Sequence, residues 1–306
     1  MFKTAMQELE SLLRTKLDLA DADIEILPVH GGDIHRSFAA RYCLPDQDTK
    51  SVFIKQNDLS HSAVLESEFS SLQRMVNEYG LDYPRPIGFY QSEQACYLLM
   101  AFHRLGGGFA TISADKIGAE LGEMLAQQHK IFDSQFGWME DNFIGLTPQP
   151  NKHCDQWVEF YRERRLESQL SLARNRGLSK QLNDGVVELM NHLEVFFHNY
   201  EPQPSLLHGD LWSGNFSIDL DTQKPLLFDP APYFGDREAD IAMTELFGGF
   251  PAGFYTAYQQ HFPLHEGYER RKPLYNLYHA LNHFNLFGSG YAGMVGSLLS
   301  EMKRHY

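Results

Sequence analysis

The hydrophobic residues of the first hundred positions fall mainly into short runs that alternate with turn-forming residues. An amphipathic helix is predicted over the first 17 residues, where charges recur at helical spacing. A second helix is predicted over 62–79, which places its apolar residues on one face and is followed by Gly80. Five runs have the composition of β-strands: residues 24–29, 37–44, 51–56, 87–90 and 95–102. The pattern predicts a five-stranded antiparallel lobe with one helix inserted.

Helical periodicity replaces this strand pattern after the consecutive glycines Gly106, Gly107 and Gly108. A β-like segment around 205–229 is the only expected interruption of the helical part. Long helical patterns are predicted over 113–132, 155–176, 179–199, 238–261 and 268–304. The chain is therefore predicted to be an α+β protein of two lobes, 1–102 and 103–306, with a hinge near Met100–Gly108.

Composition and charge narrow the possible partners. The 306 residues are 43% hydrophobic and 22% charged, as in an ordinary globular protein. The net charge of −14 disfavours nucleic acid, because such binding depends on cationic side chains that displace counterions. No apolar stretch reaches membrane-spanning length, so no membrane partner is expected. Three widely spaced cysteines form neither a disulfide framework nor a metal motif, which favours a reducing cytoplasm.

The segment His208-Gly209-Asp210-Leu211-Trp212-Ser213-Gly214-Asn215 carries the most informative chemistry, together with the apolar run that ends at Asp229. Phosphoryl transfer requires a positioned hydroxyl and magnesium held against the phosphates. Asp210 could orient the acceptor hydroxyl as catalytic base, while Asn215 and Asp229 supply the oxygen ligands that Mg²⁺ prefers. Asp, Asn and Gly are also common turn residues, which is the alternative for this motif alone.

The first lobe contains residues suited to holding ATP. Gly31 and Gly32 join two predicted strands, as a phosphate-covering loop would, although any hairpin could contain two glycines. Lys55 lies on the third predicted strand and Glu68 on the following helix, an order in which an ion pair directs the lysine toward phosphates. A surface lysine and a solvated glutamate are the alternative.

Three further residues have roles that do not involve direct catalysis. Asp240 lies in a charge-dense helix start and is interpreted as an internal brace for the catalytic loop. His279 and His283 have the i, i+4 spacing of a zinc pair, but the glutamate of an HExxH motif is missing. Packing or polar contacts are expected for both histidines.

Taken together, these motifs resemble the fructosamine kinase/ketosamine-3-kinase family, which lies within the protein-kinase-like aminoglycoside and choline phosphotransferase superfamily. The resemblance runs nearly from end to end. It rests on GGDI at 31–34, IK at 54–55, PRPIG at 84–88, LLHGDLWSGN at 206–215 and FDPAPYFGDREADIAMTELFGGF at 228–250. The combination of the last two motifs is typical of a much narrower group of proteins than the whole superfamily.

The resemblance implies a bilobal protein-kinase-like fold with an αC-like helix and a mostly helical second lobe. It implies that Asp210 is the base, that Asn215 and Asp229 bind metal, and that Lys55 and Glu68 form the phosphate-orienting pair. The adenine hinge would be Met100, Ala101 and Phe102, with Ala101 where such hinges often carry glutamate. Trp212 is predicted to form one wall of the acceptor pocket, or else to anchor the loop in the core.

The implied activity is transfer of the ATP γ-phosphate to the O3 hydroxyl of a ketosamine, with ATP and Mg²⁺ as cofactors. The product would be labile and would release the amine, which makes the enzyme a deglycation or repair kinase. Its partner would be a small-molecule or protein-linked ketosamine. The alternatives are a kinase of another small hydroxyl compound, such as an aminoglycoside or a choline-like alcohol, and a non-catalytic nucleotide-binding protein.

Overall fold

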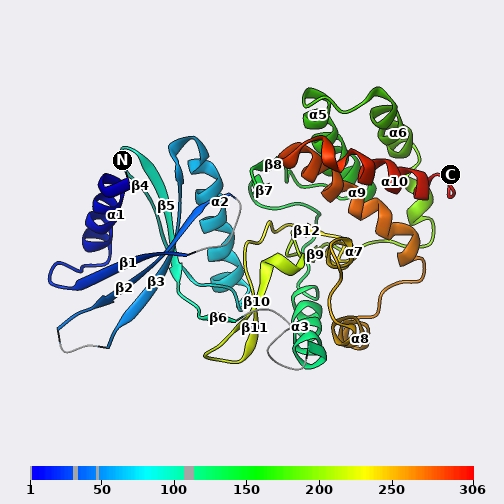
Figure 1. Cartoon of the computed structure of the whole chain (residues 1–306). Helices are drawn as coiled ribbons and strands as arrows, with labels where there is room; N and C mark the ends of the chain where they lie inside the picture. Colours follow the sequence, from blue (N-terminus) through cyan, green and yellow to red (C-terminus); the bar gives the residue numbers. More distant parts are fainter. Residues whose placement is uncertain (1, 30–33, 46–47, 107–113) are drawn as a thin grey trace. The chain divides into compact units, whose positions relative to one another are not determined.

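The computed structural model describes residues 2–29, 34–45, 48–106 and 114–306. The chain divides into two compact units (Figure 1). The first runs to Glu78 and adds Tyr83–Arg104, and the second consists of Tyr79–Asp82 and Leu105–Tyr306. The predicted glycine loop at Gly31 and Gly32 lies outside the described residues.

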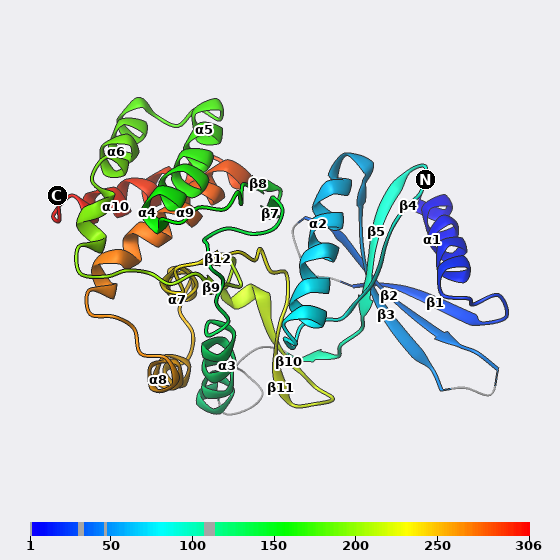
Figure 2. The same cartoon turned by 180° about the vertical axis from the view of Figure 1, so that it is seen from behind.

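The first unit contains a five-stranded antiparallel sheet in the order β1-β2-β3-β5-β4. Its strands are β1 (Asp23–Val29), β2 (Arg36–Cys43), β3 (Lys50–Asp58), β4 (Pro86–Gln91) and β5 (Ala95–Ala101). Helix α1 (Phe2–Lys16) lies on one side of the sheet and helix α2 (Ser62–Gln73) on the other, as Figures 1 and 2 show. A short 3₁₀ turn (Leu59–His61) precedes α2, and a π-helical segment (Arg74–Glu78) continues it. The predicted sheet and inserted helix are confirmed.

The side-chain alternation of β3 explains how this unit presents a lysine. Neighbouring residues of a strand point to opposite faces of the sheet. Val52 and Ile54 belong to the core that includes Leu9 and Leu13 of α1. Lys55 consequently points to the opposite face, where α2 packs against β3, β4 and β5.

The second unit is mostly helical. Its helices are α3 (Ala114–Gln128), α4 (Trp157–Phe160), α5 (Ser168–Asn175), α6 (Lys180–Met190), α7 (Glu238–Leu246), α8 (Ala252–His261), α9 (Tyr268–Phe287) and α10 (Ala292–Met302). A π-helical segment (Tyr161–Glu167) joins α4 to α5, and short 3₁₀ turns occur at Leu193–Phe197, Ser213–Asn215 and Ser289–Tyr291. Helix α3 packs against α8, and α9 packs against α7 and α10 (Figure 2).

Short strands in the second unit are more numerous than the sequence pattern predicted. The expected β-like segment contains β9 (Ser205–Leu206), β10 (Phe216–Asp219) and β11 (Lys224–Leu227). The prediction missed β6 (Leu105–Gly106), the hairpin of β7 (Asn142–Ile144) and β8 (Thr147–Gln149), and β12 (Phe234–Gly235). These strands have two or three residues each, which is too short for a period of two to be visible.

Two long predicted helices are each broken into two. The predicted helix 238–261 ends at Leu246 and begins again at Ala252, because Gly248 and Gly249 adopt φ values of 100° and 77°. The predicted helix 268–304 is interrupted at Gly288, whose φ is 90°. A left-handed glycine ends a helix even where the hydrophobic period continues.

Candidate active site

The loop between β9 and β10 carries Asp210 and makes a turn that depends on Gly209. Gly209 has a φ of 85°, and a Cβ at this position would overlap the carbonyl oxygen of Ala231. The next residue, Asp210, is half-buried, while Leu211 is fully buried and anchors the loop. The glycine therefore lets the loop approach the backbone that follows Asp229.

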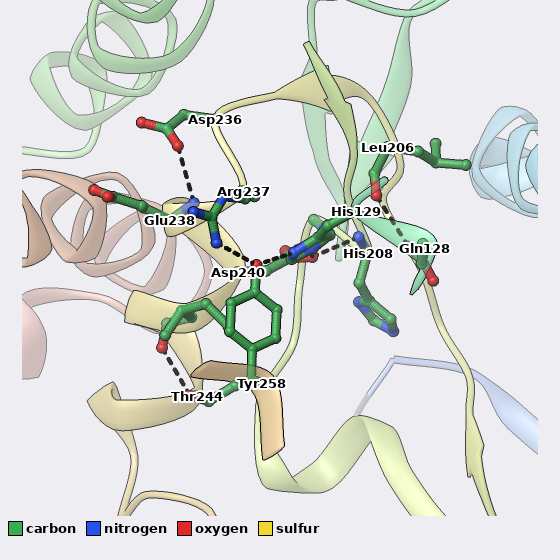
Figure 3. Close-up of polar contacts among 12 residues, drawn as sticks. Gln128, His129, Leu206, His208, Asp236, Arg237, Glu238, Asp240, Thr244 and Tyr258 are labelled. Atoms are coloured by element: carbon green, nitrogen blue, oxygen red, sulfur yellow. Dashed lines mark hydrogen bonds and ion pairs between the residues drawn. The ribbon is translucent and has the colours of Figure 1, made fainter. Parts of the chain in front are cut away.

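Asp240 of α7 is hydrogen-bonded to this loop (Figure 3). Its carboxylate accepts hydrogen bonds from the backbone N–H groups of His208 (2.7 Å) and Gly209 (2.9 Å). It also accepts one from Nε2 of His129 at 3.0 Å. The interpretation of Asp240 as an internal brace is thus confirmed for the loop that carries Asp210.

The hydrogen bonds of His129 determine which ring nitrogen carries its proton. Since the Asp240 carboxylate can only accept, His129 Nε2 donates to it, and Nδ1 accepts from the hydroxyl of Tyr258 (2.8 Å; Figure 3). Arg237 Nη1 in turn donates to the Tyr258 hydroxyl at 3.0 Å. Burial lowers the pKa of His129, so the ring is neutral. Burial raises the pKa of Asp240, but the hydrogen bond from His129 and the other contacts outweigh burial. The pKa of Asp240 is therefore lowered.

Asn215 lies against Asp210 in the 3₁₀ turn at the end of the loop. Its Nδ2 group donates to the Asp210 backbone oxygen at 2.8 Å and to Asp210 Oδ2 at 3.2 Å. Burial and the nearby Asp229 carboxylate raise the pKa of Asp210 to about 7. The five-residue spacing therefore brings the predicted base and the predicted metal ligand together.

Asp229 follows β11 and lies at the same site. The segment is tied to the loop because the Phe228 N–H donates to the Asn215 carbonyl (3.1 Å) and His208 Nε2 donates to the Phe228 carbonyl (3.1 Å). Asp229 itself has a φ of 55°, a left-handed conformation that is uncommon outside glycine and is enriched in asparagine and aspartate. Backbone of this kind tends to occur at functional sites.

The predicted metal ligands, Asn215 and Asp229, offer an amide oxygen and a carboxylate, which are donors that suit a magnesium ion. Mg²⁺ is usually bound by one or two carboxylates together with substrate phosphates, and rarely by a complete protein cage. Burial, and next to it the charge of Asp229, raise the pKa of Asp210, so a cation bound at Asp229 would favour the ionised form of Asp210. In the part of the chain that the structure describes, no group of three or more His, Cys, Asp and Glu side chains could hold a metal.

A buried group of amide side chains, which sequence reasoning missed, supports the backbone that follows Asp229. Gln149 Nε2 donates to Asn142 Oδ1 (2.8 Å) and to the Ala231 carbonyl (3.1 Å). Asn142 Nδ2 donates to the Pro232 carbonyl (2.8 Å), and the Tyr278 hydroxyl donates to Gln149 Oε1 (2.6 Å). The sequence feature that could have predicted this group is the concentration of Asn and Gln between apolar residues at 142–151.

Arg165 adds a fully buried cation to this support. Its guanidinium donates to the Pro150 carbonyl (2.6 Å) and to Asn151 Oδ1 (2.7 Å). The guanidinium carbon lies 3.9 Å from the centre of the Tyr233 ring and 4.6 Å from that of Phe160. These cation–π contacts stabilise the charge inside the unit. Tyr233 follows the Asp229 segment, and its carbonyl accepts from the Leu207 N–H at the start of the loop (3.0 Å), so Arg165 supports the loop through Tyr233.

In the other unit, Lys55 of β3 and Glu68 of α2 form an ion pair. Lys55 Nζ lies 2.6 Å from Glu68 Oε1, and the two side chains are 8% and 11% exposed. Met100, Ala101 and Phe102 are at the end of β5 and just beyond it. The N–H of Ala101 donates to the Arg85 carbonyl at 2.8 Å, so this amide is engaged within the unit.

Trp212 lies on the surface of the second unit. Its side chain is 38% exposed, and its ring packs over Gly214 and meets the ring of Phe247 edge-on at 6.4 Å. Trp212 is therefore not fully buried in the core, while its two predicted roles, as a wall of the acceptor pocket or as an anchor of the loop, stay predictions. His279 is buried and His283 donates from Nδ1 to the His279 carbonyl (2.8 Å), which agrees with the expected packing and polar contacts.

Comparison with known proteins identifies the family. The family model for fructosamine kinase matches residues 1–305. The chain belongs to the fructosamine kinase family. It is 42% identical to a protein of Synechocystis sp. named "Probable ketoamine kinase" over 90% of this chain and 89% of that protein. It is 38% identical to the chloroplastic protein-ribulosamine 3-kinase of Arabidopsis thaliana over 84% of this chain and 77% of that protein.

Solved structures agree with this membership of the fructosamine kinase family. A crystal structure from Haemophilus somnus, solved under the name fructosamine-3-kinase, has a TM-score of 0.82 and 26% identity over 96% of each chain. An aminoglycoside phosphotransferase in ternary complex with ADP and hygromycin B has a TM-score of 0.62 and 13% identity over 95% of this chain and 97% of that one. The second likeness confirms the protein-kinase-like fold. Within the described residues, no helix is both long enough and apolar enough to cross a bilayer.

Proposed function

We propose that this protein is a ketosamine kinase that transfers the γ-phosphate of ATP to the O3 hydroxyl of a ketosamine. The observation that carries the proposal is the joining of Asp210, Asn215 and the Asp229 segment by direct hydrogen bonds, in a chain of the fructosamine kinase family. Little covalent chemistry is required of the protein in phosphoryl transfer, so positioning and electrostatics carry most of the catalysis.

Asp210 is the proposed catalytic base. A general base works best when its pKa lies close to the working pH, and burial together with Asp229 raises the pKa of Asp210 to about 7. Asn215 Nδ2 orients one carboxylate oxygen of Asp210, which leaves the other oxygen to accept the proton of the acceptor hydroxyl. The brace from Asp240 keeps the backbone of the loop in place while this happens.

Asn215 and Asp229 are the proposed ligands of magnesium. Bound Mg²⁺ would neutralise the charge of the ATP phosphates and of the leaving diphosphate. The amide groups of Asn142 and Gln149 restrain the backbone just after Asp229 by their hydrogen bonds to the Pro232 and Ala231 carbonyls. This rigidity favours Mg²⁺, which demands near-ideal octahedral geometry.

Lys55, oriented by Glu68, is the proposed partner of the ATP phosphates, and Gly31 and Gly32 are the proposed phosphate-covering loop. Met100, Ala101 and Phe102 are the proposed adenine hinge. Because the Ala101 N–H already donates to Arg85, adenine would bind to other backbone groups of this segment. Trp212, exposed on the loop that carries Asp210, is the proposed wall of the acceptor pocket.

The acceptor class follows the names of the relatives, which act on ketoamines and ribulosamines by name. A phosphate at O3 sits on the carbon next to the ketosamine carbonyl. Loss of a proton from the carbon that bears the nitrogen gives an enaminol, which expels the phosphate, and water then hydrolyses the resulting imine and frees the amine. The acceptor can be a small molecule or linked to protein, and the proposed outcome is deglycation in the cytoplasm. The likeness to aminoglycoside phosphotransferases, at 13% identity, extends to the fold alone.

A screen of acceptors tests the proposal. ATP consumption is measured with a ketosamine, an aminoglycoside, choline and buffer alone, with and without Mg²⁺, and the phosphorylated position is mapped by NMR. The expected result is Mg²⁺-dependent consumption with the ketosamine and phosphate on O3. Preference for the aminoglycoside would overturn the acceptor class, and consumption with none of the acceptors would favour a non-catalytic nucleotide-binding protein.

A further inference from the structure

A row of aromatic rings leads away from the catalytic loop along the second unit. We call it the aromatic strip and define it as Trp212, Phe247, His283, Phe287 and Tyr291. The ring centres of successive members lie 6.4 Å apart for Trp212 and Phe247, and 4.7 Å apart for Phe247 and His283. His283 then contacts Phe287 (5.5 Å) and Tyr291 (5.1 Å). The strip therefore connects the loop to the C-terminal end of α9.

Both ends of the aromatic strip are open to solvent. Trp212 is 38% exposed and Phe287 is 53% exposed, while the three rings between and beside them are half-buried. Contiguous exposed apolar surface on a folded protein commonly marks a binding site. Here that surface begins two residues after the proposed base, Asp210.

The strip offers aromatic faces without a positive charge. It contains no lysine or arginine, and His283 donates from Nδ1 to the His279 carbonyl at 2.8 Å. Burial lowers the pKa of His283, so its ring is neutral at pH 7 and does not repel a cation. Aromatic faces attract ammonium groups and also bind alkyl chains.

The chemistry of a ketosamine fixes what must lie next to the base. Its nitrogen is separated from O3 by only three carbon atoms, so the nitrogen substituent starts beside the catalytic loop whenever O3 reaches Asp210. That nitrogen is an ammonium with an alkyl or peptide-borne chain attached. Uncharged aromatic faces would not stabilise a carboxylate close to the nitrogen.

We propose that the aromatic strip binds the substituent on the ketosamine nitrogen and so selects ketosamines whose amine carries an apolar chain. This inference rests on the proposed function. It assigns a binding role to Phe247, His283, Phe287 and Tyr291, and it predicts that specificity depends on the amine as well as on the sugar.

A series of acceptors with one sugar and different amines tests the strip. Ketosamines of methylamine, n-butylamine, n-hexylamine and glycine are compared by kcat/KM. Burying a methylene completely is worth roughly fourfold in an equilibrium, and an open strip that covers about half of it is worth about twofold. The hexyl compound is therefore expected to exceed the methyl compound by roughly thirtyfold, and the glycine compound should rank lowest.

Phe287→Ser removes the outer end of the strip, and Phe132→Ser is the matched control. Phe132 is 47% exposed and lies outside the strip. Phe287→Ser should reduce the hexyl-to-methyl ratio to a few-fold, whereas Phe132→Ser should leave the ratio at its wild-type value. The ketosamine of Nα-acetyl-lysine amide carries four methylenes on its nitrogen, the same number of chain carbons as the butyl compound. If its kcat/KM equals that of the butyl compound, the strip also binds lysine side chains. A kcat/KM tenfold lower than that of the butyl compound would show that it does not.

The outcomes separate this inference from the proposed function. Turnover of no ketosamine at all would overturn the proposed function. Turnover that is equal for all chain lengths would overturn the strip alone. Sedimentation of both variants tests whether the strip is instead a dimer interface. If Phe287→Ser dissociates a dimer and leaves the hexyl-to-methyl ratio unchanged, the strip binds a second copy of this chain and the inference is wrong.

Discussion

Gly209 and Ala231 approach so closely that a methyl group on Gly209 would overlap the carbonyl oxygen of Ala231. This contact joins the loop that carries Asp210 to the segment that follows Asp229. The two backbones are also joined by the Ala231 N–H, which donates to the His208 carbonyl at 2.8 Å. The geometry of the proposed site therefore depends on the absence of a side chain at one position.

Gly209→Ala should cost far more stability than a change at another left-handed glycine. Gly177 has nearly the same φ, 86° against 85°, but a Cβ on Gly177 would meet nothing within 4 Å. Gly177→Ala isolates the backbone strain, about 1 kcal/mol. Gly209→Ala adds displacement of packed backbone, about 1–3 kcal/mol more, and should abolish most turnover. Urea unfolding of both variants measures the difference, and equal losses would contradict the close approach.

Lys55 and Glu68 should behave as an energetically coupled pair. Residues in one ion-pair network are non-additive by about 0.5–3 kcal/mol, and this pair is largely shielded from solvent. A double-mutant cycle with Lys55→Met and Glu68→Gln, read in the free energy of unfolding and in ATP KM, measures the coupling. The control is Lys180 with Asp184, an ion pair whose side chains are 88% and 54% exposed. Its coupling should stay below about 0.5 kcal/mol.

His279 should make the protein sensitive to mild acid. Burial lowers its pKa from 6.5 to about 3, so the folded state keeps the ring neutral while the unfolded state takes up a proton below pH 6.5. The unfolding free energy should therefore fall as the pH drops through 6.5 toward 3. Between pH 7.5 and 5.0 this one group should remove about 2 kcal/mol.

His279→Leu is the variant that isolates this effect. His129 and His208 are also buried with lowered pKa values, so the wild-type protein loses stability for more than one reason. The comparison is the drop in unfolding free energy from pH 7.5 to 5.0 in each protein. The variant should lose about 2 kcal/mol less than the wild type, and equal drops would mean that the His279 ring takes up its proton without unfolding.

Asp210→Asn should remove turnover and leave the fold intact. Because the pKa of Asp210 is raised, its charged form is disfavoured in the folded state, and a neutral amide should not reduce stability. The expected loss in kcat is roughly 10²- to 10⁴-fold, as for other positioned acid–base groups. Asp229→Asn should instead raise the Mg²⁺ concentration needed for nucleotide binding. Wild-type turnover in Asp210→Asn would show that another group is the base.

The sequence predicted best those features that depend on local pattern. The sheet of the first unit, the pairing of Lys55 with Glu68 and the meeting of Asp210 with Asn215 all involve residues close along the chain or on neighbouring elements. What it missed involves long-range contacts. Asn142 and Gln149 reach the Ala231–Pro232 backbone from about eighty to ninety positions away in the chain, and no local period encodes such a contact.

The breaks in the long helices have a different origin. Hydrophobic periodicity continues through Gly248, Gly249 and Gly288, but the backbone at these glycines turns left-handed. The break between α7 and α8 places Phe247 beside Trp212, and the break after α9 leaves Phe287 exposed at the end of the helix. Treating the glycines as possible helix ends would have located both breaks.

Trp212→Leu should impair use of the acceptor while hardly changing stability. An exposed aromatic ring that contacts a sugar contributes apolar area and about 0.5–1.5 kcal/mol of specific ring geometry. The acceptor KM should therefore rise roughly tenfold, or kcat should fall because O3 is misoriented toward Asp210. The ATP KM should not change, because the proposed nucleotide contacts come from other residues.

The matched control for this last variant is Trp138→Leu. Trp138 is 2% exposed and packs against Phe234 with ring centres 5.6 Å apart. Shortening a buried tryptophan leaves a cavity and should cost about 2–4 kcal/mol, with a clear drop in melting temperature. Trp212→Leu should lower the melting temperature by no more than a degree or two, on the order of 0.5 kcal/mol. If Trp212→Leu destabilised the protein as much as Trp138→Leu and left the acceptor KM unchanged, Trp212 would serve the fold and not the acceptor.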